Sequence, residues 1–257
     1  MVIDVINQIC PDARILHQQE YTKILFPNID IYTTSYFTVS DKYSRNKSRA
    51  LELYKDNIFL CCAVGNEGST SSTELSKLPF WCSIGACDLK NNKLVRMQYS
   101  SISEHLDYMS LTNMQTKLGI FTGTSCATPV FASMLVLVQQ FFKLKCGRKL
   151  TNDELLSFIS DNTIDIGEEG FDNLTGNGVF RLPNPDDIDI AKYVNANKVI
   201  ELEIGNKEAK INGNTYILDS EPIIRNERTL VPIRFIAEAL NCEVYWDSIS
   251  RKVFIIQ

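Results

Sequence analysis

Hydrophobic residues follow two periods along the first part of the chain, and these periods predict helices that alternate with strands. Residues 2–9 carry apolar side chains at helical spacing, and Pro11 then ends that helix. Residues 58–64 and 80–86 are almost continuously apolar, which is typical of strands buried on both faces of a parallel sheet. The alternation predicts an α/β fold with helices packed on a parallel sheet.

Weaker patterns fill the gaps between these segments. Residues 14–21 and 29–35 are predicted to form short strands, and the second is rich in β-branched residues. Residues 44–57 carry a few apolar positions among many charges, as a surface helix does. Thr151 precedes Glu154 by three residues, and this capping box predicts a helix over residues 154–160.

The most apolar run of the chain directly follows the motif Gly123-Thr-Ser-Cys-Ala-Thr-Pro129 and continues to Val138. It predicts a long buried helix that begins near Ser125, with Pro129 in the first turn, where a residue without an N–H is tolerated. A serine hydroxyl at this place lies at the positive end of the helix dipole, where an oxyanion can be stabilised. Ser125 is therefore the candidate nucleophile. The run itself is too short for the roughly 20 residues of a membrane span.

Length, charge and cysteine content limit the classes of protein to which this chain can belong. With 257 residues and 44% hydrophobic content, the chain can form one large domain and a small one. A net charge of −5 without clustered Lys or Arg argues against a nucleic-acid partner. The eight cysteines show neither Cys-x-x-Cys pairs nor the density of a disulfide scaffold, so we expect reduced, mostly buried thiols. The first ten residues lack the features of a signal peptide, so the sequence as written predicts a soluble, cytoplasmic chain.

The composition and the pattern of predicted elements change near residue 182. Residues 182–187 have the proline and acidic content of a linker, and short alternating strands begin near residue 199. A helix over residues 233–240 and a last strand over residues 252–256 follow. The expected domains are therefore residues 1–182 and residues 199–257, joined by a linker over residues 183–198.

Two motifs of the first domain resemble those of the subtilisin-like serine proteases. The motif around Ser125 is similar to their nucleophile motif, Gly-Thr-Ser-x-Ala-x-Pro, and the stretch Ala63-Val-Gly-Asn-Glu-Gly68 is similar to their Ala-x-Gly-Asn-x-Gly loop. The resemblance, over residues 6–180, implies that Ser125 attacks the scissile carbonyl of a peptide or protein substrate. It also implies that the Asn66 side-chain amide and the Ser125 N–H stabilise the oxyanion. The other residues that support the two motifs are Gly65, Gly68, Gly123, Thr124, Ala127 and Pro129.

The rest of that family's catalytic triad has no match. Its Asp-Thr-Gly strand end and His-Gly-Thr helix start are absent, and the only histidines, His17 and His105, lie in other contexts. None of the aspartates that precede the serine stands in such a turn: Asp4, Asp12 and Asp30. Residues 1–8 resemble the later part of the family's histidine helix, so the N-terminal part of the subtilase-like sheet is expected to be missing. Three situations fit: a fragment of a longer protease, a split enzyme whose partner chain supplies the strand, Asp and His, or a decayed scaffold.

The C-terminal domain resembles another family. Val-Pro-x-Arg-Phe-x-Ala-Glu at residues 231–238, followed by Trp246-Asp247, is similar to the copper amine oxidase N-terminal-like domain. The resemblance implies a small α+β module that attaches to a cell-wall or surface ligand. The segment contains no histidine and one cysteine, Cys242, so no copper site is expected. Trp246 is predicted to close the core over the helix, with an exposed, sugar-binding Trp246 as the alternative.

Two functions of different kinds follow from these features. The first is a serine endopeptidase that acts through an acyl-enzyme on Ser125, inactive or incomplete without its Asp and His. The second is a non-catalytic binding or structural protein on the same scaffold. No cofactor is expected, and calcium stays open because scattered acids such as Glu168 and Asp172 assign no site. The attachment module points to a cell surface or phage particle, and the free thiols point to the cytoplasm.

Overall fold

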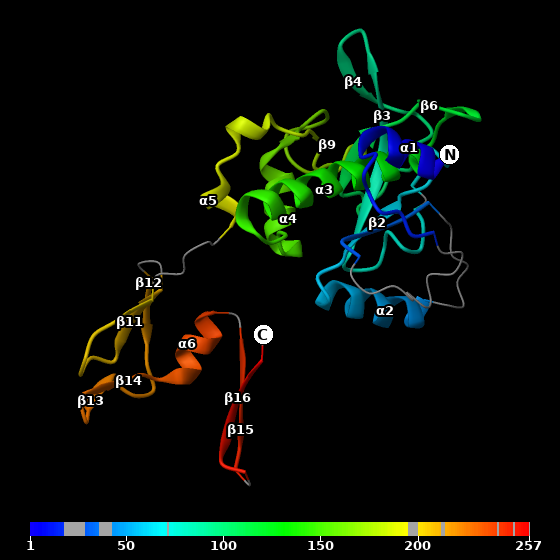
Figure 1. Ribbon diagram of the computed structural model, residues 1–257. Coiled ribbons are helices and arrows are strands. Elements are labelled where there is room, and N and C mark those ends of the chain that lie inside the picture. Colours follow the sequence, from blue (N-terminus) through cyan, green and yellow to red (C-terminus); the bar gives the residue numbers. More distant parts are fainter. Residues whose placement is uncertain are drawn as a thin grey trace. The chain divides into compact units, whose positions relative to one another are not determined.

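The computed structural model of the chain describes residues 1–17, 29–35, 43–70, 72–194, 200–211, 214–240, 242–248 and 250–256. The chain divides into two units, Met1–Val194 and Asn195–Gln257. Figure 1 draws both units, and each is described by itself below.

A mainly parallel sheet forms the centre of the first unit. In the part of the chain that the structure describes, its strands follow the order β1 (Ile31–Thr34), β2 (Phe59–Ala63), β3 (Trp81–Lys90), β5 (Tyr108–Leu111), β9 (Val179–Phe180) and β8 (Thr163–Ile164). Neighbours from β1 to β9 run parallel, whereas β8 is antiparallel to β9, and β4 (Lys93–Arg96) is antiparallel to β3. The predicted α/β class with a parallel sheet is confirmed. All five residues of β2 are buried, as their continuous apolar run predicts.

Helices cover both faces of this sheet (Figure 1). The long helix α3 (Thr124–Cys146) covers one face, and its Phe131 packs with Phe59 and Ile84 in the largest core cluster. The other face is covered by α2 (Tyr43–Lys55), with Leu53 against Leu60 and Trp81. Helix α1 (Val2–Ile9) packs beside the start of α3 through Val5, Cys126 and Val130. The predicted helix over residues 2–9 is thus confirmed.

Among the described helices, α3 alone has the length and mean hydropathy that a membrane span needs. Its most apolar window is 67% buried inside the unit, as in the core helix of a globular domain. Before α3, the hairpin of β6 (Met114–Thr116) and β7 (Gly119–Phe121) leads the chain into the serine motif.

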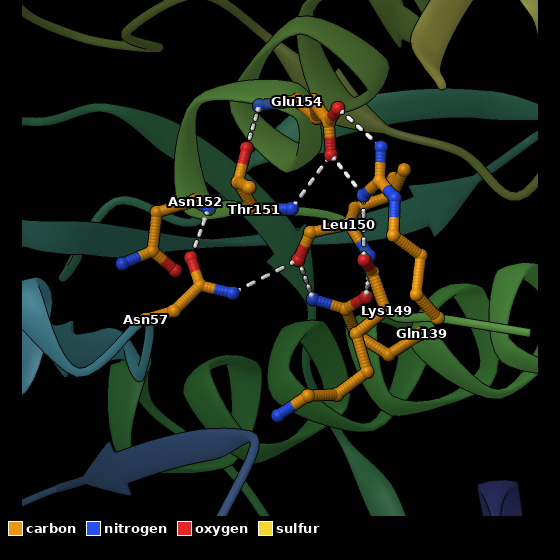
Figure 2. A network of polar contacts seen from close by, with 8 residues as sticks. Asn57, Gln139, Lys149, Leu150, Thr151, Asn152 and Glu154 are labelled. Atoms are coloured by element: carbon orange, nitrogen blue, oxygen red, sulfur yellow. Dashed lines mark hydrogen bonds and ion pairs between the residues drawn. The ribbon is translucent and has the colours of Figure 1, made fainter. Parts of the chain in front are cut away.

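Backbone groups between α3 and α4 (Asn152–Asp161) are held by two amide side chains (Figure 2). Gln139 is 4% exposed; its Nε2 donates to Leu150 O at 3.1 Å, and its Oε1 accepts from Leu150 N at 2.8 Å. Asn57 Nδ2 donates to the same carbonyl at 3.2 Å, and Asn57 Oδ1 accepts from Asn152 N at 2.7 Å. The buried junction therefore has partners for its polar backbone groups.

The predicted capping box is present at the start of α4. Thr151 Oγ1 accepts from Glu154 N, and the Glu154 carboxylate accepts from Thr151 N at 2.8 Å. Arg148 holds the same carboxylate with two hydrogen bonds of 2.7 and 2.8 Å.

Two of the predicted segments differ from the structure. Residues 14–17 are not in a strand, and residues 18–21 lie outside the described residues. The first part of the predicted linker, residues 183–194, contains η2 (Pro185–Asp187) and α5 (Ile190–Tyr193), and it packs on the first unit through Ile188, Ile190 and Tyr193. Tyr193 is 9% exposed, and its ring centroid lies 4.9 Å from that of Phe158. Asn184, in the stretch that suggested a linker, caps η2 because its Oδ1 accepts from Asp186 N at 3.2 Å, and Asp189 caps α5 by accepting from Ala191 N.

The second unit is small and rich in strands, as expected for an α+β domain. Its elements are the antiparallel sheet β10 (Ile200–Leu202), β11 (Glu208–Ile211) and β12 (Asn214–Ile217), the hairpins β13 (Ile223–Arg225) with β14 (Arg228–Leu230) and β15 (Glu243–Asp247) with β16 (Lys252–Ile256), and α6 (Ile233–Ala239).

The predicted core of this second unit is wrong in one respect. Trp246 and Leu240 are each 49% exposed, so Trp246 does not close a core over α6. The described strands form three separate sheets rather than one, and α6 packs beside β15 of one of them. Among the described residues of the unit, the buried apolar positions include Ala237 and Ala239 on α6, Ala209 on β11, and Leu218.

Candidate active site

Ser125 lies in the first turn of α3, which begins at Thr124. The capping residue, Gly123, has a φ of +93°, a conformation that residues with a side chain rarely adopt. A Cβ at this position would also lie 3.3 Å from Asn66 Oδ1. The backbone conformation therefore favours glycine, and a side chain at this position would also make Asn66 shift by a few tenths of an ångström.

Asn66, in the loop after β2, contacts the residue before the serine. Its Oδ1 accepts hydrogen bonds from Thr124 N at 2.8 Å and from Thr124 Oγ1 at 3.1 Å. Because a backbone N–H can only donate, the atom that faces it must be the amide oxygen. The Nδ2 donor of this exposed side chain is thereby left for another acceptor beside Ser125.

The two glycines of the Asn66 loop fix its path. Gly65 has a φ of +125°, and its carbonyl accepts from Ser101 N at 3.0 Å. Gly68 has a φ of +65° and donates to Tyr99 O at 2.8 Å. Backbone hydrogen bonds with residues 99–101 therefore hold this loop in place.

Ser125 is bonded to Ser35, which directly follows β1. Ser35 Oγ donates to Ser125 O at 2.9 Å, and Ser125 Oγ lies 3.5 Å from Ser35 O, to which it donates. The Ser125 carbonyl has no helical partner, because Pro129, four residues on, lacks an N–H. The prediction that Pro129 lies in the first turn is wrong, since α3 begins at Thr124 and the proline is in the second turn. The Ser35 hydroxyl supplies the missing hydrogen bond.

The structure does not bring a general base to Ser125 among the described residues. His17 and His105 are both exposed, and neither forms a hydrogen bond with the serine; the His105 Nε2 lies 3.8 Å from Glu104. Asp4 pairs with the N-terminal amine, and Asp30 pairs with Lys149. A serine hydroxyl without an adjacent base is a weak nucleophile.

A cavity of about 260 Å³ lies beside β1, lined by residues of α1, α3, β1 and the stretch 13–17. Its lining is largely apolar and includes Ile6, Ile31 and Val136. Thr33 Oγ1, on the β1 side, is buried without a hydrogen-bond partner. This is the side of the sheet where the sequence predicts missing structure.

Burial changes the chemistry of the groups beneath the site. It raises the pKa of Asp107 to about 6, although the Ser83 N–H, 2.7 Å from its carboxylate, opposes this shift. Burial, and next the charge of Asp107, raise the pKa values of the Cys61 and Cys82 thiols well above their ordinary range. All eight cysteines are free and six are buried, so the prediction that the thiols are mostly buried is confirmed. No group of three or more His, Cys, Asp or Glu side chains in the described ranges could hold a metal ion.

The part of the chain that contains Ser125 and Asn66 matches a known protein family. The family model described as "Subtilase family" matches residues 15–178. The chain belongs to the subtilase family. Residues 187–255 of this subtilase match a second family, "Copper amine oxidase N-terminal domain".

Individual relatives agree with this assignment. The subtilase is 26% identical over 144 residues to the major intracellular serine protease of Bacillus subtilis (strain 168). The matched region covers 52% of this chain and 44% of that protein. The chain thus spans less than half the length of that relative. The crystal structure of a lanthipeptide protease is similar with a TM-score of 0.56 and 16% identity, covering 70% of this chain and 72% of that one. This likeness shows the fold.

Sequence reasoning missed three residues that contact the serine motif of the subtilase: Ser35, Tyr99 and Thr112. Ser35 directly follows β1, which runs parallel to β2, and Asn66 lies in the loop after β2. Polar residues that follow neighbouring parallel strands meet at the same sheet edge, and this signal could have indicated Ser35. No local pattern marks Tyr99, whose hydroxyl accepts a hydrogen bond from Gly123 N at 3.1 Å.

Proposed function

We propose that this subtilase cleaves peptide bonds through an acyl-enzyme on Ser125, once a histidine and an aspartate are supplied to it. The observation that carries the proposal is the orientation of Asn66. Its oxygen is held by both donors of Thr124, which leaves the amide Nδ2 as a donor beside the nucleophile. A scaffold that only binds or packs has no need of such an arrangement.

The proposed reaction follows from the groups at the start of α3. Ser125 Oγ attacks the peptide carbonyl while its proton passes to the histidine, and the carbonyl oxygen becomes an oxyanion. The Ser125 N–H belongs to the first turn, where helical N–H groups lack helical partners, so it and Asn66 Nδ2 can donate to this oxyanion. The histidine then protonates the leaving amine, and water hydrolyses the ester. No cofactor takes part in these steps.

The histidine and aspartate of this proposal come from outside the described residues, on a further segment or a partner chain. Two features support this part of the proposal. Helix α1 packs against Cys126, the residue after the nucleophile, so a segment joined to α1 has a short path to Ser125. The cavity beside β1, with the unpartnered Thr33 Oγ1, has room for additional polypeptide. The expected occupant is an extended strand that carries the aspartate.

The alternative is a non-catalytic binding or structural protein. It is favoured by the exposed, distant placement of His17 and His105. The second unit fits either function, since we propose that it attaches to a cell-wall or surface ligand. The exposed aromatic rings of Tyr245 and Trp246, 61% and 49% exposed, are the groups that would contact such a ligand.

The deciding experiment is labelling of the purified chain with a fluorophosphonate probe, with Ser125→Ala as control and circular dichroism as a test of folding. Labelling that Ser125→Ala abolishes is the expected result of an activated serine. The oxyanion donors alone can retain a rate roughly 10³-fold above that in water, so slow labelling is expected even without the histidine. A folded chain that never reacts would favour the scaffold alternative.

A further inference from the structure

Two hydroxyl groups form hydrogen bonds with Gly123, the residue that caps helix α3. Gly123 N donates to Tyr99 Oη at 3.1 Å, and Gly123 O accepts from Thr112 Oγ1, also at 3.1 Å. Tyr99 Oη in turn donates to Thr112 Oγ1 at 3.4 Å. The three residues thus form a closed ring of hydrogen bonds, and Tyr99 Oη also accepts from Thr122 Oγ1 at 3.5 Å. Such chains of bonds polarise and strengthen one another.

This ring is built into the unit rather than lying on its surface. Thr112 is 4% exposed, and its own N–H is held by Cys87 O at 3.0 Å. The aromatic side chain of Tyr99 packs against the largest core cluster. Both hydroxyls therefore come from side chains with fixed positions, and the flexible backbone of Gly123 is the part that they restrain.

Asn66 also lies close to Gly123, and its Oδ1 accepts the next N–H along the chain, that of Thr124. The peptide units that lead into Ser125 are therefore held by the two hydroxyls and by the Asn66 amide oxygen. Glycine at a φ of +93° has access to many other conformations, so these contacts select the one that the helix start needs.

We propose that Tyr99 and Thr112 are positioning residues, which fix Gly123 and through it the N–H and hydroxyl of Ser125. The consequence for peptide cleavage rests on the function proposed above. The restraint itself does not, because it concerns the conformation of the folded chain.

The test uses Tyr99→Phe and Thr112→Val, which remove one hydroxyl each and keep the shape of the side chain. The matched control is Tyr54→Phe, which removes a tyrosine hydroxyl bonded to Asp153 at 2.7 Å, in a different part of the unit. Amide hydrogen exchange and amide chemical shifts are measured by NMR, and the fluorophosphonate rate constant is measured on the same samples.

We expect Tyr99→Phe to speed exchange of the Gly123 amide by about fivefold or more relative to Tyr54→Phe, the effect of losing the hydrogen bond that this N–H donates. Thr112→Val should speed it less, because this variant removes the bond to the Gly123 carbonyl and loosens Tyr99 Oη only indirectly. The amide signal of Ser125 should shift in both variants, and the double variant should add little to Tyr99→Phe, because all three bonds belong to one ring. Where the unmodified chain reacts with the probe, the rate constant should fall about tenfold in both variants and stay unchanged in the control.

Unchanged exchange at Gly123, or an unshifted Ser125 amide, would overturn the restraint. Faster exchange with an undiminished labelling rate would overturn the positioning role. A chain that does not react with the probe at all would count against the proposed function, and the exchange and shift measurements would still decide whether Tyr99 and Thr112 fix Ser125.

Discussion

Ser35 Oγ donates a 2.9 Å hydrogen bond to Ser125 O, the carbonyl that Pro129 leaves without its helical partner. Pro129, in the second turn of α3, thus leaves the Ser125 carbonyl of the first turn unpaired, and a hydroxyl from the end of the neighbouring strand satisfies it. The bond joins β1 to the nucleophile's own peptide unit. Secondary structure on one side of the sheet is thereby coupled to the position of the serine.

Replacing Ser35 by alanine should expose the importance of this bond. Ser35→Ala leaves the Ser125 carbonyl unpaired, and we expect a loss of about 1–2 kcal/mol in the free energy of unfolding, measured by urea denaturation. The matched control is the same change in a Pro129→Ala background, where the new N–H can reach the carbonyl within the helix. An equal loss in both backgrounds would contradict the role of Ser35.

The two ends of the Asn66 amide should be separable by mutation. Asn66→Asp keeps an oxygen acceptor for Thr124 N and Oγ1 but removes the Nδ2 donor. We expect the melting temperature to change little, because a negative charge at the start of α3 is favourable. The fluorophosphonate rate constant should fall by roughly 10²–10³, the cost of losing one oxyanion donor, a magnitude measured in this same family.

The comparison variant is Asn66→Ala, which loses both ends of the amide. It should lower the melting temperature as well as the labelling rate. If Asn66→Asp reacts as fast as the unmodified chain, then Nδ2 is not an oxyanion donor.

Local patterns predicted the elements whose structure depends on nearby residues. The continuous apolar run of β2 and the Thr151–Glu154 capping box each contain the information that specifies them. The burial of Tyr193 could not be predicted in this way, because it depends on Phe158, which is far away in the sequence. The exposure of Trp246 was missed for a similar reason, since it depends on how the strands group into sheets.

The candidate site shows the same division. The motifs predicted Ser125 and Asn66, and the structure brings their loops together. The contacts of Ser35 and Tyr99 join residues 90 and 24 positions away from their partners, and they depend on a few ångströms in the approach of separate elements. Nothing in the residue types alone specifies such distances.

Stability should fall with rising pH because of Asp107. Burial raises its pKa to about 6 in the folded state, against 3.8 for the unfolded chain. Between these values the folded protein retains a proton that the unfolded chain has lost, so the free energy of unfolding decreases as pH rises from about 4 to 6. A difference of two pKa units corresponds to roughly 3 kcal/mol.

The measurement is urea denaturation of Asp107→Asn and of the unmodified chain at pH 4 and pH 7. The variant should gain up to about 3 kcal/mol relative to the unmodified chain between the two pH values, because its amide does not titrate. Asp56→Asn, an exposed position, serves as control and should show no such gain. Parallel pH dependences for Asp107→Asn and the unmodified chain would refute the assignment.

Gln139 should be essential for the junction between α3 and α4. Gln139→Leu keeps the approximate volume but leaves Leu150 N without its partner in a buried place, where an unpaired donor costs about 1–3 kcal/mol (Figure 2). Arg148→Ala, which removes an exposed pair with Glu154, should cost less than about 1 kcal/mol. Equal effects of the two variants on the urea midpoint would contradict the importance of burial here.

Supplying the missing triad residues should activate Ser125. A subtilase segment with an Asp-x-Gly strand end and a His-Gly-Thr helix start, fused ahead of Met1, leads directly into α1, which packs beside Cys126. The added strand has the cavity beside β1 as its place, where Thr33 Oγ1 needs a partner. Proton transfer to a positioned histidine contributes typically 10²–10⁴ in rate, so we expect fluorophosphonate labelling to accelerate by about that factor. The same fusion with its histidine replaced by alanine should react no faster than the chain alone. If the intact fusion folds and gains nothing over this control, the scaffold is no longer able to assemble a triad, and the non-catalytic alternative is favoured.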